Sequence, residues 1–344
     1  MIPPKKLAAS FVLAAAVLLG GTVTESRAQV ITFKDKRITI VIGYGVGGTY
    51  YQYAQLFSRH LSRHLPDKPT IIVQSMPGAG GLKMLNYAAT QMPADGTNVF
   101  VPPDTMVLMQ LLETTGIGFD ARKFGYVGTG DQQNNIWVIR KAAGSSLEDV
   151  RAKEVIMGHS GRGSTGLMIP AIAKELLGLK VKLIGGYEGS RDAIYAIERG
   201  EIDGADFGWE TWTTAVPRWF ERGKEFAVPI LQVGLTPDPD VPAVPMLSSL
   251  ADQSDRRIVD LFGVIGMIGR GLALPPGAPD AYLQALRAAF TKMLDDPEYQ
   301  AEATRLRLRV LPTHGDELAK AIRDSIDNAD AALIERARAL IVPK

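Results

Sequence analysis

Two glycine-rich segments each stand between a strand-like run and a helix-like run, where they could bind an anion. The first is Gly43-Tyr-Gly-Val-Gly-Gly-Thr49, and the second is Gln74-Ser-Met-Pro-Gly-Ala-Gly-Gly81. Glycines let backbone amides approach a ligand closely, and a helix N-terminus after them presents unpaired N–H groups with a partial positive charge. If the two segments lie at the same end of neighbouring parallel strands, they form one rim. That rim would hold a small acidic ligand, largely through main-chain groups.

The elements that must position these segments alternate between strand and helix, which predicts an α/β fold. Strands are predicted at residues 38–42, 70–73, 99–101, 124–127, 136–139, 154–157, 181–184, 202–207 and 226–233, and helices at 50–65, 82–92, 168–177, around 193–197, and at 280–294. Pro170 predicts that its helix either starts late or kinks. The capping-box spacing of Thr313 and Asp316 predicts one long helix through Leu340, and residues 261–268 form a further apolar run.

In this order of elements, one α/β unit interrupts another, and the chain crosses between them at least twice. We therefore expect two lobes that hinge around a central cleft, joined by strand-like crossovers. Residues 29–130 and 233–344 form the first lobe in this interpretation, with the last helix free to pack on the second. Residues 131–232 form the second lobe.

The N-terminus has the pattern of an export signal. Lys5 and Lys6 precede the apolar run 7–19, and Ser26-Arg27-Ala28 ends in a small-x-small pattern. This predicts a signal peptide over residues 1–28, cleavage after Ala28 and a periplasmic location. An uncleaved N-terminal anchor is the alternative, although the apolar run is short for a membrane span.

Composition narrows the classes of function. The chain has 38 Lys and Arg against 37 Asp and Glu, and it stays near neutrality without residues 1–28. We therefore expect no nucleic-acid partner and no anionic membrane surface as partner. The absence of cysteine excludes disulfides, thiolate metal sites and cysteine nucleophiles. No cofactor and no metal are predicted, and the chain is expected to be a monomer.

Three other patterns point to different chemistry but are incomplete. Gly43, Gly45 and Gly48 match a dinucleotide fingerprint, yet the next strand ends without the carboxylate that would bind ribose. His60 and His64 have a metal-binding spacing on a helix, where a solvated helix face is the simpler interpretation. Ser164 lacks the nucleophile elbow of a hydrolase, because Arg162 occupies the first glycine position. The protein is therefore not predicted to be an enzyme, and an exported α/β hydrolase is kept as an alternative.

Several motifs, in order along the chain, carry a family resemblance. They are Pro77-Gly-Ala-Gly-Gly81, Pro93-Ala-Asp-Gly-Thr97, Ser160-Gly-Arg-Gly-Ser164, Tyr187-Glu-Gly-Ser190 and Gly200-Glu-Ile-Asp203, with the proline-rich segments 237–245 and 274–279 after them. With the signal peptide, this series resembles the periplasmic solute-binding proteins of tripartite tricarboxylate transporters, the Bug (Bordetella uptake gene) family. The resemblance implies a Venus-flytrap fold of two α/β lobes that closes on a small carboxylate. In the family, first-lobe loops hold the carboxylate through amides and ordered water, and the second lobe contacts the rest of the ligand.

The chain departs from the family pattern at positions that would affect the ligand. Tyr51 and Gln55 stand where the family often has Asp and Arg, Leu167 stands where it has His, and Glu188 stands where it has Lys. Because Tyr51 adds apolar area beside the rim, we expect a ligand with an apolar or aromatic body.

The predicted ligand-binding residues come from both lobes. They are Gly47, Gly48, Thr49, Tyr50, Tyr51, Pro77, Gly78, Ala79, Gly80 and Gly81 of the first lobe, and Arg162, Gly163, Ser164, Thr165, Tyr187, Glu188, Phe207 and Trp209 of the second. Arg162 either pairs with a ligand carboxylate, or faces solvent or pairs with Glu188 or Glu210. The aromatic residues Tyr50, Tyr51, Trp209 and Trp212 either wall the ligand or pack in the core.

The predicted function is capture of a small organic carboxylate for the permease subunits of a tripartite tricarboxylate-type transporter. A ligand sensor for a membrane receptor is the alternative within this fold.

Overall fold

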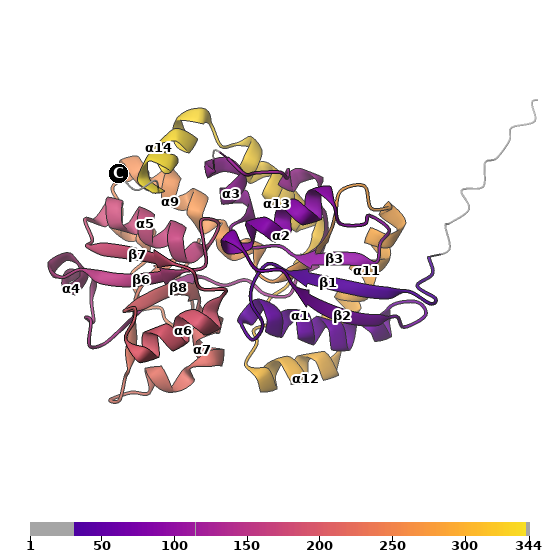
Figure 1. The fold of residues 1–344 in the computed structure, drawn as a ribbon, viewed down its shortest axis with the longest axis horizontal. Helices are drawn as coiled ribbons and strands as arrows, with labels where there is room; N and C mark the ends of the chain where they lie inside the picture. Colours follow the sequence, from indigo (N-terminus) through magenta and orange to yellow (C-terminus); the bar gives the residue numbers. More distant parts are fainter. Residues whose placement is uncertain (1–30, 114, 342–344) are drawn as a thin grey trace, which may run out of the picture. The chain divides into compact units, whose positions relative to one another are not determined.

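Two mixed β-sheets organise the part of the chain that the structure describes (Figure 1). A computed structural model describes residues 31–113 and 115–341, so the predicted signal peptide and its cleavage site lie outside the described residues. Between the strands of both sheets run helices, as the alternating pattern of the sequence predicts.

The first sheet holds the strands that lead into the two glycine-rich segments. Its strands lie in the order β11 (Thr313–His314), β4 (Gly125–Thr129), β10 (Gly271–Leu274), β3 (Asn98–Val101), β1 (Arg37–Ile42) and β2 (Thr70–Ser75). Strand β1 is parallel to β2 and to β3, whereas β10 is antiparallel to β3 and β4. Because Ile42 pairs with Ser75, both glycine-rich segments leave the same end of adjacent parallel strands, as expected from the sequence.

The second sheet is built from one continuous stretch of chain. Its strands lie in the order β7 (Val181–Gly185), β6 (Val155–His159), β8 (Gly204–Gly208), β5 (Asn135–Arg140) and β9 (Ala227–Val233). Strand β6 is parallel to β7 and β8, and β5 is antiparallel to β8 and β9. The second sheet thus interrupts the first in sequence, which is the two-lobed arrangement predicted above. The exact lobe boundaries remain a prediction.

Helices cover the sheets on both faces (Figure 1). The α-helices are α1 (Thr49–His60), α2 (Leu82–Thr90), α3 (Met106–Leu112), α4 (Leu147–Ala152), α5 (Thr165–Leu177), α6 (Ser190–Arg199), α7 (Trp209–Ala215), α8 (Leu247–Leu250), α9 (Arg256–Gly263), α10 (Ile265–Ile268), α11 (Asp280–Leu294), α12 (Pro297–Leu306), α13 (Gly315–Asp327) and α14 (Ala331–Ile341). Short 3-10 turns are η1 (Leu61–His64), η2 (Ala79–Gly81), η3 (Ala121–Lys123), η4 (Pro217–Phe220) and η5 (Gln253–Asp255).

The alternation of side chains along β1 explains why helices pack on both faces of the first sheet. Ile40 and Ile42 belong to the buried cluster that contains Phe57 of α1. Val41, which points to the opposite face, belongs to the cluster that contains Leu85 of α2. A strand buried on both faces reads as a continuous apolar run, as β1 does in the sequence.

Two local predictions were wrong, and one of the two alternatives stated for Pro170 is excluded. The predicted long C-terminal helix is broken over residues 328–330 into α13 and α14, while the apolar run 261–268, to which no element was assigned, forms the end of α9 and α10. The capping box does not form: His314 is the N-cap of α13, without a side-chain cap bond, because Thr313 pairs in β11. Helix α5 begins before Pro170 instead of after it. Helix α14 packs against α5 of the second lobe and α3 of the first.

The two histidines of the first helix also differ from expectation. His60 is buried, and its Nε2 lies 2.6 Å from Glu302 of α12, while His64 Nε2 lies 3.0 Å from Asp296. They therefore join α1 and η1 to the segment of α12, instead of forming a solvated face. No helix of the described ranges combines the length and apolarity needed to cross a membrane.

Candidate functional site

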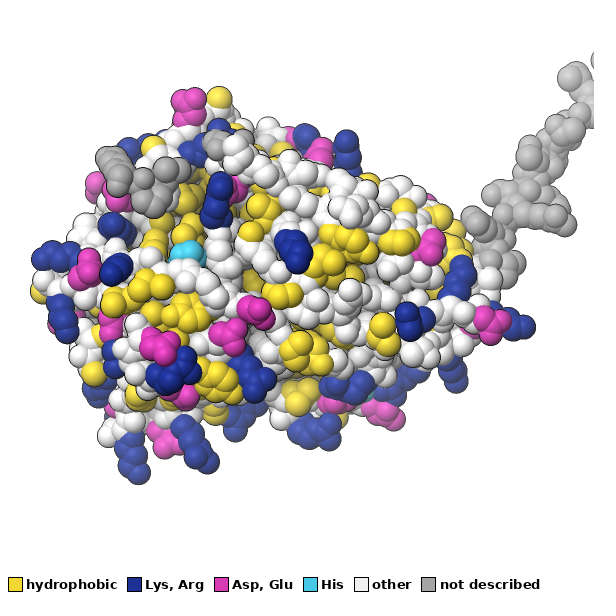
Figure 2. Space-filling model, viewed as in Figure 1, with side chains coloured by type: hydrophobic (Ala, Val, Ile, Leu, Met, Phe, Trp, Pro, Cys, Tyr) yellow, Lys and Arg dark blue, Asp and Glu magenta, His cyan; other side chains and the backbone are white. Residues whose placement is uncertain are grey.

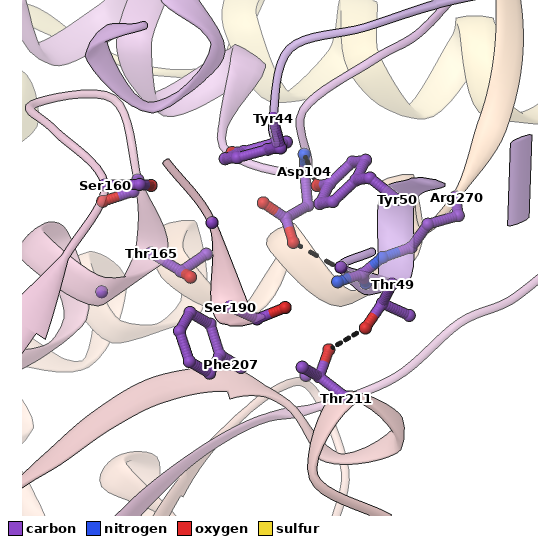
Figure 3. Close-up of a pocket in the computed structure, with 15 residues that line it drawn as sticks. Tyr44, Thr49, Tyr50, Asp104, Ser160, Thr165, Ser190, Phe207, Thr211 and Arg270 are labelled. Atoms are coloured by element: carbon purple, nitrogen blue, oxygen red, sulfur yellow. Dashed lines mark hydrogen bonds and ion pairs between the residues drawn. The ribbon is translucent and has the colours of Figure 1, made fainter. Parts of the chain in front are cut away.

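A pocket lies where the loops of the two sheets meet (Figure 3). It contains about 500 Å³ of space free of protein atoms, part of it open to solvent. Its lining consists of Tyr44, Gly48, Thr49, Tyr50, Asp104, Ser160, Ser164, Thr165, Gly166, Gly189, Ser190, Phe207, Gly208, Thr211 and Arg270. Both lobes contribute, so a molecule in this pocket contacts both sheets' loops.

Helix N-termini converge on this pocket. The N-cap residues of α1, α5, α6 and α7 are Gly48, Ser164, Gly189 and Gly208, and all four line it. In none of the four helices does the side chain of the N-cap residue accept a hydrogen bond from a backbone N–H of the first turn. The first N–H groups of a helix lack intrahelical acceptors, and the aligned peptide dipoles place partial positive charge at this end. The longer helices α1, α5 and α6 therefore give the pocket a field that favours an anion.

Arg270 brings a full positive charge to the same pocket. It follows Gly269, which has φ +52° and whose Cβ, if present, would lie 1.8 Å from the carbonyl oxygen of Asp131. The backbone N–H of Arg270 donates to the carboxylate of Asp131, and its carbonyl accepts from Gly130 at 2.9 Å. Only glycine fits before Arg270, and these bonds then fix where the arginine side chain starts.

The guanidinium of Arg270 is buried but loosely partnered. The residue is 4% exposed, and its Cζ lies 4.7 Å from the ring centroid of Tyr50, a cation–π arrangement. Its Nη1 lies 3.8 Å from Oδ2 of Asp104 and 3.9 Å from Oδ2 of Asp131, beyond hydrogen-bond distance. Its Nε has no hydrogen-bond partner in the described part of the chain. The guanidinium, which lines the pocket, is therefore held by long ion pairs and by the Tyr50 ring.

Asp104 faces Arg270 across the inner end of the pocket (Figure 3). It follows β3, and its backbone N–H donates to the hydroxyl of Tyr50 at 3.0 Å. The residue is 4% exposed. Burial raises the pKa of its carboxyl group, while the Arg270 cation opposes that increase. The pocket thus presents one carboxyl group and one guanidinium side by side.

Further acids lie behind the pocket wall, held by polar partners. Asp131 accepts from Gln133 Nε2 at 2.7 Å, and Asp206 accepts from Asn135 Nδ2 at 2.7 Å. Burial is the main cause that raises the pKa of both carboxyl groups.

Glu210 is the acid that links the lobes. The hydroxyl of Tyr53 lies 2.7 Å from both of its carboxyl oxygens, and the backbone N–H of Arg309 also donates to it. Burial, with a contribution from Asp131, raises the pKa of Glu210 to about 8. At pH 7 this carboxyl group is therefore mostly protonated.

The second glycine-rich segment contacts the second lobe beside the pocket. The N–H of Gly80 donates to the carbonyl of Ser160 at 3.0 Å, and the N–H of Gly163 donates to the carbonyl of Ala79 at 3.2 Å. A third bond runs from the N–H of Gly45 to the carbonyl of Glu188 at 3.0 Å. The lobes are thus joined main chain to main chain, because glycines allow the two backbones to approach.

Six of the predicted site residues line the pocket: Gly48, Thr49, Tyr50, Ser164, Thr165 and Phe207. The others surround it. Gly47 borders a neighbouring hollow, and outside the lining lie Tyr51, Pro77, Gly78, Ala79, Gly80, Gly81, Arg162, Gly163, Tyr187, Glu188 and Trp209.

Arg162 and the tryptophans have specific alternative partners. The Arg162 side chain is 60% exposed and pairs with Glu113, instead of Glu188 or Glu210. Trp209 is buried, with its ring centroid 5.0 Å from that of Phe220, and Trp212 donates its Nε1–H to the carbonyl of Ile136 at 3.1 Å. Both tryptophans pack in the buried cluster of the second sheet.

Sequence reasoning missed nine lining residues: Tyr44, Asp104, Ser160, Gly166, Gly189, Ser190, Gly208, Thr211 and Arg270. Asp104 could have been found, because it follows a strand parallel to β1 and so lies at the same sheet edge as the glycine-rich segments. Arg270 had a weaker signal, a basic residue between two glycines and two apolar runs. Within residues 31–113 and 115–341, no group of three or more His, Asp or Glu side chains is arranged to hold a metal ion.

Comparisons with known proteins support one relationship over nearly the whole chain. No protein-family model matches the chain. It is 24% identical over 348 residues to a UPF0065 protein of Cupriavidus necator, covering 96% of each. The structure is similar to that of the periplasmic binding protein BugD, with a TM-score of 0.69, 17% identity, and coverage of 88% of this chain and 97% of that one.

A second solved structure, MatC of Rhodopseudomonas palustris with bound malate, gives a TM-score of 0.67 at 19% identity, covering 89% of this chain and 99% of that one. At these identities the structural likeness shows the fold, and the UPF0065 relative extends the likeness to the sequence. The comparisons therefore confirm the resemblance predicted from the motifs: the chain resembles the Bug and tricarboxylate-type periplasmic solute-binding proteins and has their two-lobed fold.

Proposed function

We propose that this protein is a periplasmic solute-binding protein that captures a small organic carboxylate for a tripartite tricarboxylate-type permease. The observation that carries the proposal is the convergence on one pocket of three helix N-termini, those of α1, α5 and α6, with the buried Arg270. Because the guanidinium of Arg270 lines the pocket and its Nη1 lies beyond hydrogen-bond distance of Asp104 and Asp131, it offers a carboxylate a charged partner.

The remaining lining indicates how the rest of the ligand is held. Tyr44 and Tyr50 lie with ring centroids 4.4 Å apart on the first-lobe side, and Phe207 faces them from the second lobe (Figure 3). Aromatic walls with a few polar groups are typical of small-ligand pockets. We therefore expect an acid with an apolar or aromatic body, held by these three rings instead of by Tyr51, which lies outside the lining.

The proposed partners are a small carboxylate ligand and a membrane permease. The solved structure of MatC holds malate, a small hydroxy acid, which supports a carboxylate ligand here. Acidic and basic side chains are interspersed on the face that Figure 2 draws, so that face offers no single-sign patch for a polyanion. A monomer that meets a permease is our proposal. A sensor that presents the same liganded form to a membrane receptor is the alternative.

A thermal-shift panel with matched acids and amides tests the proposal. A ligand that binds only the folded state raises Tm, so benzoate, hexanoate, succinate and citrate are each compared with the corresponding amide. We expect stabilisation by at least one acid and none by its amide. Stabilisation by amides and acids alike would refute carboxylate capture, and turnover of a stabilising compound would favour the exported-hydrolase alternative. Mass spectrometry of small molecules released from protein purified from the periplasm identifies the native ligand.

A further inference from the structure

We propose that the pocket selects an acid that also carries a cationic nitrogen, and that the carboxyl group of Asp104 binds that nitrogen. This inference rests on the proposed function and narrows its ligand class. It starts from a feature that simple carboxylate capture does not explain, a buried carboxyl group in the wall of an anion-binding pocket.

Arg270 already has an acidic neighbour behind the pocket wall. Asp131 is fully buried, accepts from the backbone N–H of Arg270 and from Gln133, and lies 3.9 Å from Nη1. Asp131 does not line the pocket, so a ligand in the pocket cannot take its place beside Arg270. Two acids, Asp104 and Asp131, thus flank the one guanidinium at similar distances, and Asp104 is the one of the two that lines the pocket.

Asp104 is placed to contact a ligand directly. Its side chain is 5% exposed, that small exposure opens into the pocket, and Figure 3 shows its carboxyl group directed toward the space between Tyr44, Thr165 and Ser190. At 3.8 Å from Nη1 of Arg270, the carboxyl group is not engaged in a direct hydrogen bond with the guanidinium. A buried carboxylate needs a charged or hydrogen-bonding partner, and an ammonium group of the ligand would supply both.

The opposite end of such a ligand matches the rest of the pocket. The N-termini of α5 and α6 bring Ser164, Thr165 and Ser190 to the second-lobe side, where a carboxylate would meet backbone N–H groups. The guanidinium of Arg270 lines the same pocket and supplies a positive charge. A ligand with two carboxylates and no cation would instead place negative charge against Asp104, which is unfavourable in a buried site.

The test measures affinity by calorimetry for two matched pairs: phenylalanine against 3-phenylpropanoate, and 5-aminopentanoate against pentanoate. Glutarate serves as the dicarboxylate comparison. Because hydrogen bonds to charged groups are stronger than neutral ones, we expect the amino compound of at least one pair to bind about tenfold to hundredfold more tightly. Asp104→Asn has nearly the same shape and should reduce that ratio to about one.

Asp104→Asn should also bind the deaminated acid several-fold more tightly than the wild type does, because a repelling charge has been removed. General damage to the pocket cannot produce that increase. Glu113→Gln is the matched control, since Glu113 pairs with Arg162 outside the lining, and its ratio should equal the wild-type ratio. Asp104→Ser serves in place of Asp104→Asn if the latter has a lowered Tm.

The outcomes separate this inference from the proposed function. Equal or tighter binding of the deaminated acids or glutarate, with a ratio that Asp104→Asn leaves unchanged, overturns the inference and supports the proposed function. Binding of none of the five acids, with native mass spectrometry showing a non-acidic compound in the pocket, overturns both.

Discussion

Gly80 offers a direct test of how the two lobes come into contact. Its φ is +67°, and an added Cβ would lie 2.5 Å from the backbone nitrogen of Ser164 and 2.7 Å from the carbonyl carbon of Gly163. Real Cβ atoms do not approach backbone atoms so closely, and main chain cannot rotate away as a side chain can. Gly80→Ala should therefore prevent the second glycine-rich segment from reaching the second lobe.

The expected loss of binding free energy follows from the hydrogen bonds that depend on this contact. Two main-chain hydrogen bonds would be lost, from Gly80 to Ser160 and from Gly163 to Ala79. At about 1 kcal/mol each, their loss weakens ligand binding by about 2 kcal/mol, roughly 30-fold in Kd, if binding requires the lobes to meet. Alanine at positive φ adds about 1–2 kcal/mol of backbone strain, which lowers the free energy of unfolding.

Gly178→Ala is the matched control, because it carries the strain without the contact. Gly178 has φ +64°, ends α5 and has no atom within 4 Å of an added Cβ. Both variants should lose similar stability, whereas only Gly80→Ala should weaken binding in calorimetry. Small-angle scattering should show that added ligand compacts Gly178→Ala and leaves Gly80→Ala expanded. Equal Kd values for the two variants would refute the argument that Gly80 is needed for lobe contact.

Four further predictions concern the pocket, the lobe junction and export. Arg270→Met should abolish binding of carboxylates in calorimetry while keeping apolar contact with Tyr50, and unchanged Kd would remove the guanidinium from the site. Thr49→Val should weaken ligand binding about fivefold, because the hydroxyl of Thr49 lies 2.8 Å from that of Thr211 across the lobes. In a double-mutant cycle, adding Thr211→Val to Thr49→Val should cause little further loss of affinity. The pKa of Glu210 is raised to about 8 from 4.5, so the folded state binds more protons than the unfolded state, and the free energy of unfolding should fall as pH rises from about 5 to 8. Glu210→Gln should flatten that dependence in denaturant titrations at several pH values, and an unaltered slope would contradict the raised pKa. N-terminal sequencing of protein from the periplasm should begin at Gln29, and an intact Met1 would contradict cleavage after Ala28.

The sequence predicts the parts of this protein that depend on local pattern. The apolar run of β1, the glycines after it and the amphipathic spacing of α1 are all short-range signals, so the strand, turn and helix were found within a few residues. The C-terminal break over residues 328–330 has no glycine or proline to mark it. Apolar periodicity continues through it, and the two helices pack on different elements, α13 on β4 and α14 on α5. The local signal is Asp330, whose Oδ1 accepts from the backbone N–H of Leu333 as an N-cap side chain does.

The polar centre of the site could not be predicted in the same way, because distant segments form it. Strand β10 inserts antiparallel between β3 and β4, and this pairing brings Arg270 beside Asp104 and Asp131. Periodicity in the sequence identifies strands but does not give their order in a sheet. Sequence reasoning therefore chose Arg162, the basic residue inside a glycine-rich loop, and missed the arginine that the sheet carries into the pocket.

The electrostatics of the pocket depend on which of its buried acids are ionised. Four acids lie in or behind the pocket wall near one arginine, yet burial raises the pKa of each of them, and that of Glu210 reaches about 8. At neutral pH Glu210 is mostly uncharged, so its proton can be shared with Tyr53 at the lobe junction instead of adding negative charge. Asp131 lies beside Arg270 behind the pocket wall, and the N-termini of α1, α5 and α6 add a positive field to the pocket. A pocket with several buried acids is therefore consistent with carboxylate binding, provided that the group facing Asp104 is not another carboxylate.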